Sequence, residues 1–265
     1  MFLMANHRLL NIKHGFNYRD VGGYPTYDGR ITKWHRVVRA GNLAHLDLNE
    51  QRYLKEYGVV CDVDLRSEGE VNRNPDRVPH GVKYYFNPIH GNKRPPKITD
   101  LKVRFSNDPT LSHRHMMLMY RHMIDSHHSR HYYRRLFKFF LKFGKKGAVL
   151  LHCSQGKDRT GMGVAMLLLT LGVDIKTVKQ DYLISEKEMV PYVKLKQDKY
   201  RKYNVNDNFM DNVKSLYTVS SDYFDSAMDE VQKKYSTWYR FEHKYLRLND
   251  RKIVKLRRLY LIDPR

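Results

Sequence analysis

A ten-residue stretch, HCSQGKDRTG at positions 152–161, lies between two apolar runs and limits the folds open to this chain. The preceding run, GAVLL, is short and apolar, which predicts a buried strand that ends at the stretch. The following run, MGVAMLLLTLG, is longer and ends in Gly172, which predicts a buried helix from Thr160 to Leu171. The stretch is therefore predicted to be the tight connection between a strand and a helix.

Segments typical of strands and helices alternate along the first two thirds of the chain. Asp28-Gly29 indicates a hairpin, and Asp47 with Glu50 resembles a capping box at the start of a helix. Strands are expected at residues 59–65, 82–89 and 147–152, with a shorter one ending near Arg39. Helices are expected at 48–57, 99–124 and 129–144, with a loop at 90–97.

This alternation predicts an α/β fold with a mainly parallel central sheet flanked by helices on both faces. After Gly172 the pattern is almost entirely helical, and a helical insertion near residues 185–225 could cap one end of the domain as a lid. We expect one domain over residues 1–265, because 41% hydrophobic residues suffice for a sizeable core and no linker interrupts the chain.

Membrane, secretory and disulfide-rich classes are not indicated. A run of about 18 uncharged apolar residues, as a transmembrane helix needs, is absent from the sequence. The start, MFLMANHRLLNIKHGFN, lacks the sustained apolar region of a signal peptide, so we expect a cytoplasmic protein, with export that uses no signal peptide as the alternative. The two cysteines, Cys61 and Cys153, cannot build a disulfide framework.

The formal net charge of +21, from 49 Lys and Arg against 28 Asp and Glu, favours anionic partners. Charge alone does not separate phosphorylated substrates from nucleic acid or anionic lipid, but we expect no nucleic-acid partner. The segment VKLKQDKYRKY at 193–203 is predicted to be a solvated helix face, with weak contact to an anionic membrane as the alternative.

Neither a metal nor a cofactor is expected, and we expect a monomer. Six histidines lie between positions 113 and 131, but they lack cysteines or paired carboxylates at metal-ligand spacing.

The chemistry indicated by the stretch centres on Cys153, at the end of the predicted strand. A tight loop after it would turn successive backbone N–H groups inward and form a cradle for an anion. The positive end of the following helix would add to this field, and both would lower the pKa of the Cys153 thiol. Arg159 would offer a planar two-pronged donor to a phosphoryl group, and a thiolate beneath the phosphorus would be a nucleophile.

The pattern Cys-x5-Arg-Thr, preceded by His, resembles the signature of the cysteine-dependent protein tyrosine phosphatase superfamily. The inner letters GKDRTG resemble the atypical bacterial tyrosine/lipid phosphatases, whose loop reads HCxxGKDRTG. Ala40, where that family has serine, is one of several mild departures. The other matching stretches are NYRDVGGY (17–24), VVRAGNL (37–43), DLRSEGEVNRNPD (64–76) and DYLISEKEM (181–189). The resemblance covers residues from about 15 to 262.

The resemblance implies a tyrosine phosphatase-like fold and a metal-independent phosphatase with a phosphocysteine intermediate on Cys153. It implies that His152 orients the loop and helps to keep the thiolate, and that the Thr160 hydroxyl helps the thiolate to leave. The residues expected to bind phosphate are Ser154, Gln155, Gly156, Lys157, Asp158 and Arg159.

The acid that protonates the leaving oxygen has two candidates. The resemblance implies Asp158, which would also activate water, with a bracing role in the loop as its alternative. Asp64 is the rival, because strand carboxyl ends are where ligands bind in open α/β sheets. Its structural alternative is a salt bridge to Arg66 or Arg19, and Arg19 itself is interpreted as scaffolding together with Asp20.

Lys157 and Cys61 also leave alternatives open. Lys157 could be a second cation that favours a doubly phosphorylated inositol ring, or a solvated lysine that adds only to the local field. Cys61 could form a protective disulfide with Cys153 under oxidation, or be a plain thiol in the core.

The function predicted from the sequence is hydrolysis of phosphotyrosine, extending to phosphoserine, phosphothreonine and phosphoinositides. Two alternatives stay open. One is a phosphoinositide phosphatase with little protein activity, and the other is a catalytically idle module that binds phosphorylated ligands.

Overall fold

The computed structural model describes residues 8–92 and 97–263, so residues 1–7 and 93–96, part of the loop expected at 90–97, lie outside the description. Within these ranges a five-stranded sheet has the order β1-β3-β6-β4-β5. β3, β6, β4 and β5 are parallel, and β1 pairs antiparallel with β3 at one edge. The mainly parallel sheet predicted from the sequence is confirmed. The strands are β1 (Arg19–Asp20), β3 (Val37–Ala40), β4 (Val59–Asp64), β5 (Lys83–Phe86) and β6 (Ala148–His152), with β2 (Ile31–Thr32) paired to β7 (Leu261–Ile262).

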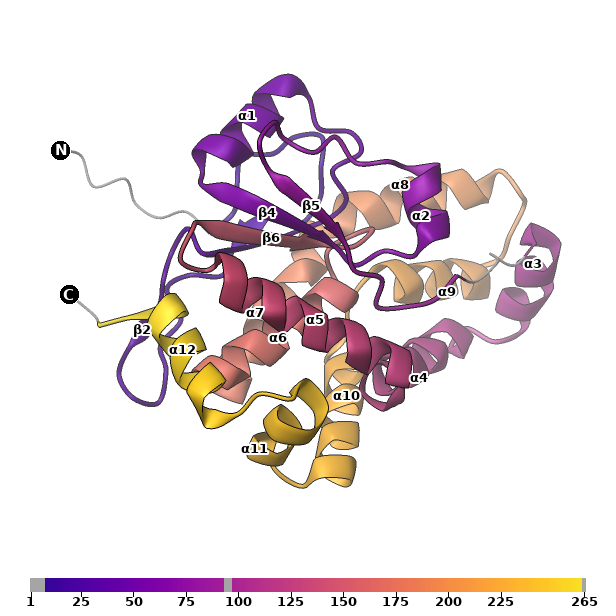
Figure 1. Ribbon diagram of the computed structural model, residues 1–265. Coiled ribbons are helices and arrows are strands. Elements are labelled where there is room, and N and C mark those ends of the chain that lie inside the picture. Colours follow the sequence, from indigo (N-terminus) through magenta and orange to yellow (C-terminus); the bar gives the residue numbers. More distant parts are fainter. Residues whose placement is uncertain (1–7, 93–96, 264–265) are drawn as a thin grey trace.

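Helices cover both faces of the sheet, as predicted (Figure 1). On one face Leu54 of α1 packs on Val38 and Leu150, and on the other face α5 and α6 pack on Val63 and Leu151. The helices are α1 (Leu48–Glu56), α2 (Glu68–Arg73), α3 (Ile98–Asn107), α4 (Leu111–Asp125), α5 (His127–Phe143), α6 (Arg159–Leu171), α7 (Ile175–Glu188), α8 (Val190–Arg201), α9 (Asp207–Tyr217), α10 (Ser221–Tyr235), α11 (Trp238–Phe241) and α12 (Asp250–Tyr260), with a π-helical turn at Glu242–Leu246.

Local signals fix several of these elements. Asp47 and Glu50 form the predicted capping box of α1, and Gly172 ends α6 in the left-handed conformation. The single helix expected at 99–124 is wrong, because the segment forms α3 and α4. Asp108 is extended ahead of Pro109, as a residue before proline prefers, and this breaks the helix.

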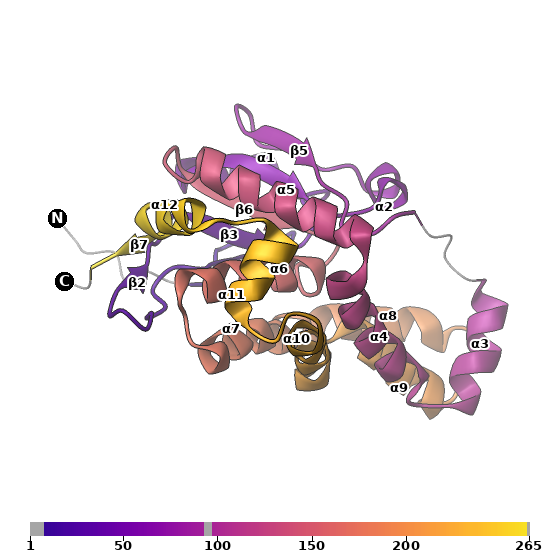
Figure 2. The same cartoon turned by 60° about the horizontal axis from the view of Figure 1, so that its bottom comes forward.

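The region predicted as a helical insertion contains α8, α9 and the start of α10. Phe105 of α3 packs against Phe209 and Val213 of α9 in a small core of their own. Figure 2 shows α3, α8 and α9 together at one end of the molecule, where α4 joins them to the rest. None of the helices in the described ranges is both long enough and apolar enough to span a bilayer.

Candidate active site

The loop between β6 and α6 is compact and almost fully enclosed. Every residue of β6 is buried, as is all of α6 except Leu169. Gly156 has φ of +69°, and a Cβ at this position would lie 2.3 Å from the Ala40 carbonyl oxygen. Only glycine can occupy this point of the loop, because any side chain would clash with β3.

Consecutive loop carbonyls are held from one side by side chains of distant segments. Asn42 donates to the Ser154 carbonyl at 2.9 Å, and Asn17 donates to the Gln155 carbonyl at 3.1 Å. The next carbonyl, of Gly156, accepts from Nη2 of Arg39 at 2.9 Å. The C=O and N–H groups of one planar peptide point in opposite directions, so the amides that follow these carbonyls face away from the supports. This is the arrangement that an anion cradle requires.

Arg159 is fixed by a carboxylate from α2. Its Nη1 and Nη2 donate to the two Glu70 oxygens at 2.7 and 2.8 Å, and the Ser154 hydroxyl also donates to Glu70. The pair is mostly buried, and although burial raises the pKa of Glu70, Arg159 lowers it well below its usual range. A guanidinium has five N–H donors, so this contact sets its plane and leaves donors for a second anion.

Cys153 lies directly after β6 and is 1% exposed. Burial raises the pKa of this thiol, but the Arg159 charge and the hydroxyl and amide of Thr160 bring it below its ordinary value. The Thr160 hydroxyl has no other hydrogen-bond partner among the residues described. The surroundings therefore favour the thiolate, the nucleophilic form.

His152 lies beneath the loop among buried carboxylates. Its Nε2 is 3.3 Å from Asp62, 3.2 Å from Asp76 and 3.7 Å from Asp64. Burial lowers the pKa of His152, but these charges outweigh it and raise the pKa well above the usual value. The protonated ring places Nδ1 3.3 Å from the Cys153 carbonyl oxygen, where it can donate and orient the loop.

Asp158 and Lys157 form a buried pair at the start of α6. Lys157 donates to Oδ1 of Asp158 at 2.8 Å, and the hydroxyl of Tyr120 donates to the same oxygen at 2.7 Å. The Lys157 side chain is 1% exposed, so it is not the solvated lysine that was one of the sequence alternatives. These contacts hold the Asp158 carboxyl in one orientation beside the loop.

Asp64 forms a salt bridge with Arg66, which was the structural role predicted as the alternative to catalysis. Arg66 donates to both of its oxygens, at 2.9 Å from Nε and 2.7 Å from Nη2, and Tyr84 adds a hydrogen bond. Burial raises the pKa of Asp64, but His152 and Arg66 bring it down to about 2. A carboxyl bound in this way is a poor proton donor near neutral pH.

A comparison with models of known protein families shows which family this chain belongs to. A family model described as "Tyrosine phosphatase family" matches residues 10–262. The chain belongs to the tyrosine phosphatase family. Its assignment to this family agrees with the resemblance seen in the HCSQGKDRTG stretch.

Individual relatives are distant. A protein of Cupriavidus necator named as a tyrosine-protein phosphatase is 30% identical over 172 residues, which cover 64% of this chain and 60% of that protein. The triple specificity protein phosphatase PtpB of Mycobacterium tuberculosis is 29% identical over 199 residues, covering 68% of this chain and 69% of PtpB. A tyrosine-protein phosphatase of Nostoc commune is 28% identical over 151 residues, covering 56% of this chain and 47% of that protein. The chain thus spans about 60% of the length of the Cupriavidus protein.

Sequence reasoning assigned no role to several residues that shape the site of this family member. Glu70 lay within the family-like stretch DLRSEGEVNRNPD without an assigned role, and in the structure it also completes a capping box of α2 with Ser67. Arg39 and Asn42 lay within a stretch that resembles the family, without a partner that sequence spacing could reveal. The residues missed in this way are Asn17, Arg39, Asn42, Glu70 and Tyr120.

Cys61 cannot reach Cys153 in this fold. β4 and β6 align Cys61 with Val149, four residues before Cys153, which is a separation of about 13 Å at the rise of a strand. A disulfide needs Cα atoms within about 7 Å, so the protective disulfide would require the sheet to move. Burial raises the pKa of Cys61 to about 12, as for a core thiol.

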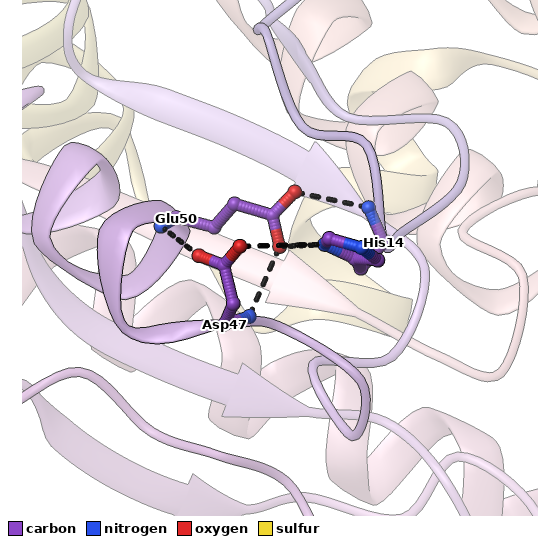
Figure 3. Close-up of side chains that lie close together, drawn as sticks. All are labelled: His14, Asp47 and Glu50. Carbon is purple, nitrogen blue, oxygen red and sulfur yellow. Dashed lines mark hydrogen bonds and ion pairs between the residues drawn. The ribbon is translucent and has the colours of Figure 1, made fainter.

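Two clusters of potential metal ligands, found among residues 8–92 and 97–263, make structural contacts of their own. Figure 3 shows the first, His14, Asp47 and Glu50, where Glu50 accepts the backbone N–H of Asp47 and of His14 and so ties the N-terminal segment to α1. The second cluster joins Asp62 and Asp76 to His152. A metal needs a neutral imidazole, whereas the surrounding carboxylates favour its protonated form.

Arg39 supports the loop between β6 and α6, so removing its side chain should lower the stability of the protein. Arg39 is fully buried and binds Asp181 at 2.6 Å as well as the Gly156 carbonyl. Arg39→Ala should lower the free energy of unfolding by about 3–5 kcal/mol, because it leaves the buried carboxylate of Asp181 without one of its cationic partners. Urea unfolding measures this, with Arg52→Ala on the exposed face of α1 as control. Equal losses in the two variants would contradict the assigned support.

Proposed function

We propose that this chain is a cysteine-dependent phosphatase that hydrolyses phosphotyrosine through a phosphocysteine intermediate. The observation that supports it most is the buried Cys153 thiol, whose pKa is lowered beside Arg159 in a loop with its carbonyls tied back. Membership of the tyrosine phosphatase family supports the same chemistry.

In the first proposed step the Cys153 thiolate attacks phosphorus, so an S–P bond forms while the bond to the ester oxygen breaks. Loop amides and the donors of Arg159 that Glu70 leaves unused stabilise the charge on the phosphoryl oxygens. The protonated carboxyl of Asp158 gives its proton to the leaving oxygen, which departs as the alcohol.

In the second step water attacks the phosphocysteine. Asp158, now a carboxylate, takes a proton from this water as the P–O bond forms. The S–P bond breaks, phosphate is released and the sulfur leaves as a thiolate. The Thr160 hydroxyl stabilises this thiolate, and His152 holds the loop through the Cys153 carbonyl.

Asp158 is preferred as the acid because Arg66 and Tyr84 occupy both oxygens of Asp64, whereas Lys157 and Tyr120 both donate to Oδ1 of Asp158 and leave Oδ2 for a proton. Asp158→Asn should lower kcat for an alkyl phosphate by about 10²–10⁴-fold, since proton transfer to a poor leaving group is lost. The pre-steady-state burst of p-nitrophenol from p-nitrophenyl phosphate should fall much less, because this leaving group needs little protonation, although the later hydrolysis of the phosphocysteine is slowed for both substrates. Asp64→Asn is the matched comparison, with its fold checked by melting. A larger loss in Asp64→Asn than in Asp158→Asn, with both folded, would reverse the assignment.

Phosphoinositides are a second proposed substrate class, supported by a basic pocket beside the loop. The pocket holds about 300 Å³, and Ser154 and Gln155 form one wall. Arg73 from α2 and Lys196 from α8 also line it, and could bind a second phosphate while the first lies on the loop. PtpB, one of the relatives, is named a triple specificity phosphatase, which is a reason to test more than phosphotyrosine.

The double variant Arg73→Ala, Lys196→Ala tests this pocket. We expect kcat/KM for a soluble bisphosphorylated inositol phosphate to fall by at least about tenfold, with a change below about threefold for a phosphotyrosine peptide, since each lost contact to a charged group costs about 1.5–3 kcal/mol. Lys187→Ala, an exposed lysine on α7, is the control. Equal losses on both substrates would contradict a second phosphate site, and a panel with phosphoserine and phosphothreonine peptides defines the remaining breadth.

Weak contact with an anionic membrane stays a prediction that α8 supports. This helix has no buried side chain, and it carries Lys194, Lys196, Lys199 and Arg201 against the single acid Asp198.

The alternative function is a catalytically idle module that binds phosphorylated ligands. This alternative would be correct if the wild-type chain bound phosphate but hydrolysed no aryl phosphate.

A further inference from the structure

A pair of buried tyrosines continues from Asp158 into the core. The Tyr120 hydroxyl of α4, which donates to Oδ1 of Asp158, accepts a hydrogen bond from the Tyr182 hydroxyl of α7 at 2.8 Å. Both tyrosines are at most 1% exposed, and their rings meet edge to face with centroids 6.0 Å apart. Gly161 leaves room for this arrangement, because a Cβ at that position of α6 would lie only 3.1 Å from the Tyr182 ring. Asp158 is thus joined to two helices outside the loop.

The direction of the two hydrogen bonds follows from the protons available. A tyrosine hydroxyl has one proton, so Tyr120, which gives its proton to Oδ1, can only accept from Tyr182. Burial raises the pKa of both hydroxyls well above the ordinary value, and the Asp158 charge raises it further. Both tyrosines therefore stay protonated near neutral pH, and the chain of hydroxyls ends on the carboxyl.

The hydrogen bonds of Asp158 differ from those of structural carboxylates in this chain. Asp64 and Asp181, both buried, accept hydrogen bonds on each of their two oxygens. Lys157 and Tyr120, in contrast, both donate to Oδ1 of Asp158, whose side chain is 13% exposed. Two donors on one oxygen fix the plane of the carboxyl and leave the other oxygen to carry a proton. A positioned proton donor needs this asymmetry, whereas a structural carboxylate does not.

The packing of this region does not require the two hydroxyls. The rings of Tyr120 and Tyr182 belong to the main hydrophobic core, where the ring of Phe224 has its centroid 5.4 Å from that of Tyr182. Phenylalanines would fill the same space without burying two polar groups, whose burial is offset only by the hydrogen bonds that they make. Because the chain of hydroxyls ends on Asp158, the carboxyl is the group that these hydroxyls serve.

We propose that Tyr120 is a positioning residue, supported by Tyr182, that holds Oδ2 of Asp158 within reach of the leaving oxygen, an assignment that rests on the proposed function with Asp158 as its acid. When Oδ2 gives its proton to the leaving oxygen, the carboxyl becomes a carboxylate. The hydrogen bond from Tyr120 to Oδ1 then becomes charge-assisted and stronger. In the second step Oδ2 takes a proton from the attacking water, and the same hydrogen bond keeps it in place. Neither tyrosine transfers a proton itself.

The first test compares Tyr120→Phe with the wild-type chain in the hydrolysis of an alkyl phosphate. We expect kcat to fall by at least about tenfold, since a hydrogen bond to a charged group is lost, while KM changes by less than about threefold. The burst of p-nitrophenol from p-nitrophenyl phosphate should change by less than about threefold, because that leaving group needs little protonation. Tyr245→Phe is the matched control, because it removes an equally buried hydroxyl that donates to the Met123 carbonyl.

The double variant Tyr120→Phe, Tyr182→Phe guards this test against misfolding. Tyr120→Phe alone leaves the buried Tyr182 hydroxyl without its acceptor, whereas the double variant removes both partners of that hydrogen bond, which costs less stability. It should show the same loss of kcat on the alkyl phosphate, with a melting temperature close to that of the wild-type chain.

A double-mutant cycle with Asp158→Asn separates positioning from a purely structural role. Tyr120→Phe should lower kcat for the alkyl phosphate by less than about threefold when Asp158→Asn is already present, because the proton transfer that Tyr120 supports is gone. An equal loss in both backgrounds would overturn the assignment of Tyr120. Activity of Tyr120→Phe within about threefold of the wild-type chain would also overturn it, and a retained loss in Asp158→Asn would then leave the phosphatase function intact. If the wild-type chain hydrolysed no aryl phosphate, or if Asp158→Asn cost no activity, the proposed function or its acid would fail and the role of Tyr120 with it.

Discussion

Cys153→Ser should reduce turnover of a phosphotyrosine peptide by at least about 10⁴-fold, because a serine hydroxyl at neutral pH is a far weaker nucleophile than a thiolate. The substituted chain should still bind phosphate, since the amides of the loop and Arg159 are unchanged. The measurement is steady-state turnover together with isothermal titration of inorganic phosphate.

Cys61→Ala is the matched control for this variant. Cys61 is a core thiol of β4 that lies outside the loop, so its loss should affect stability more than activity. If Cys61→Ala removed activity and Cys153→Ser retained it, the position of the nucleophile would be wrong. If both variants retained activity, the chain would use another mechanism.

Arg159→Lys should lower kcat/KM by about 10³-fold although the charge is conserved. A lysine cannot reproduce the planar fork that binds Glu70 with two nitrogens and leaves further donors for the phosphoryl group. Arginine side chains that stabilise phosphoryl transfer typically contribute about 10³–10⁵-fold, so the loss should appear mainly in the chemical step.

Arg52→Lys, on the exposed face of α1, is the control for the same chemical change. Phosphate binding by Arg159→Lys should weaken, but the melting temperature should change little if the lysine still pairs with Glu70. A loss below tenfold in kcat/KM would show that charge alone suffices at this position.

The strand, the loop and the helix around Cys153 could be predicted because their signals are local. An apolar run, a glycine-containing turn and a second apolar run follow one another within 26 residues, and the loop residues lie between the two runs. The capping box of α1 was equally local. Pro109 was also visible in the sequence, but the surrounding helical pattern obscured its effect, and α3 and α4 were predicted as one helix.

Contacts between distant segments could not be predicted in the same way. Glu70 and Arg159 are 89 residues apart, and Arg39 and Asp181 are 142 residues apart. The first pair forms because the parallel sheet brings the carboxyl ends of β4 and β6 to one edge, and the second forms because the fold places Asp181 of α7 against Arg39 of β3. Lys157 illustrates the same limit, because a lysine in a loop is usually solvated, and its burial against Asp158 depends on the tertiary fold.

The central claim is that phosphate is transferred to the sulfur of Cys153 during turnover. The most direct measurement is an acid quench during hydrolysis of a phosphotyrosine peptide, followed by peptide mass spectrometry of the chain. The account predicts a phosphorylated peptide that contains Cys153, and its absence from Cys153→Ser. Turnover without this adduct, or with phosphate on a different residue, would contradict it.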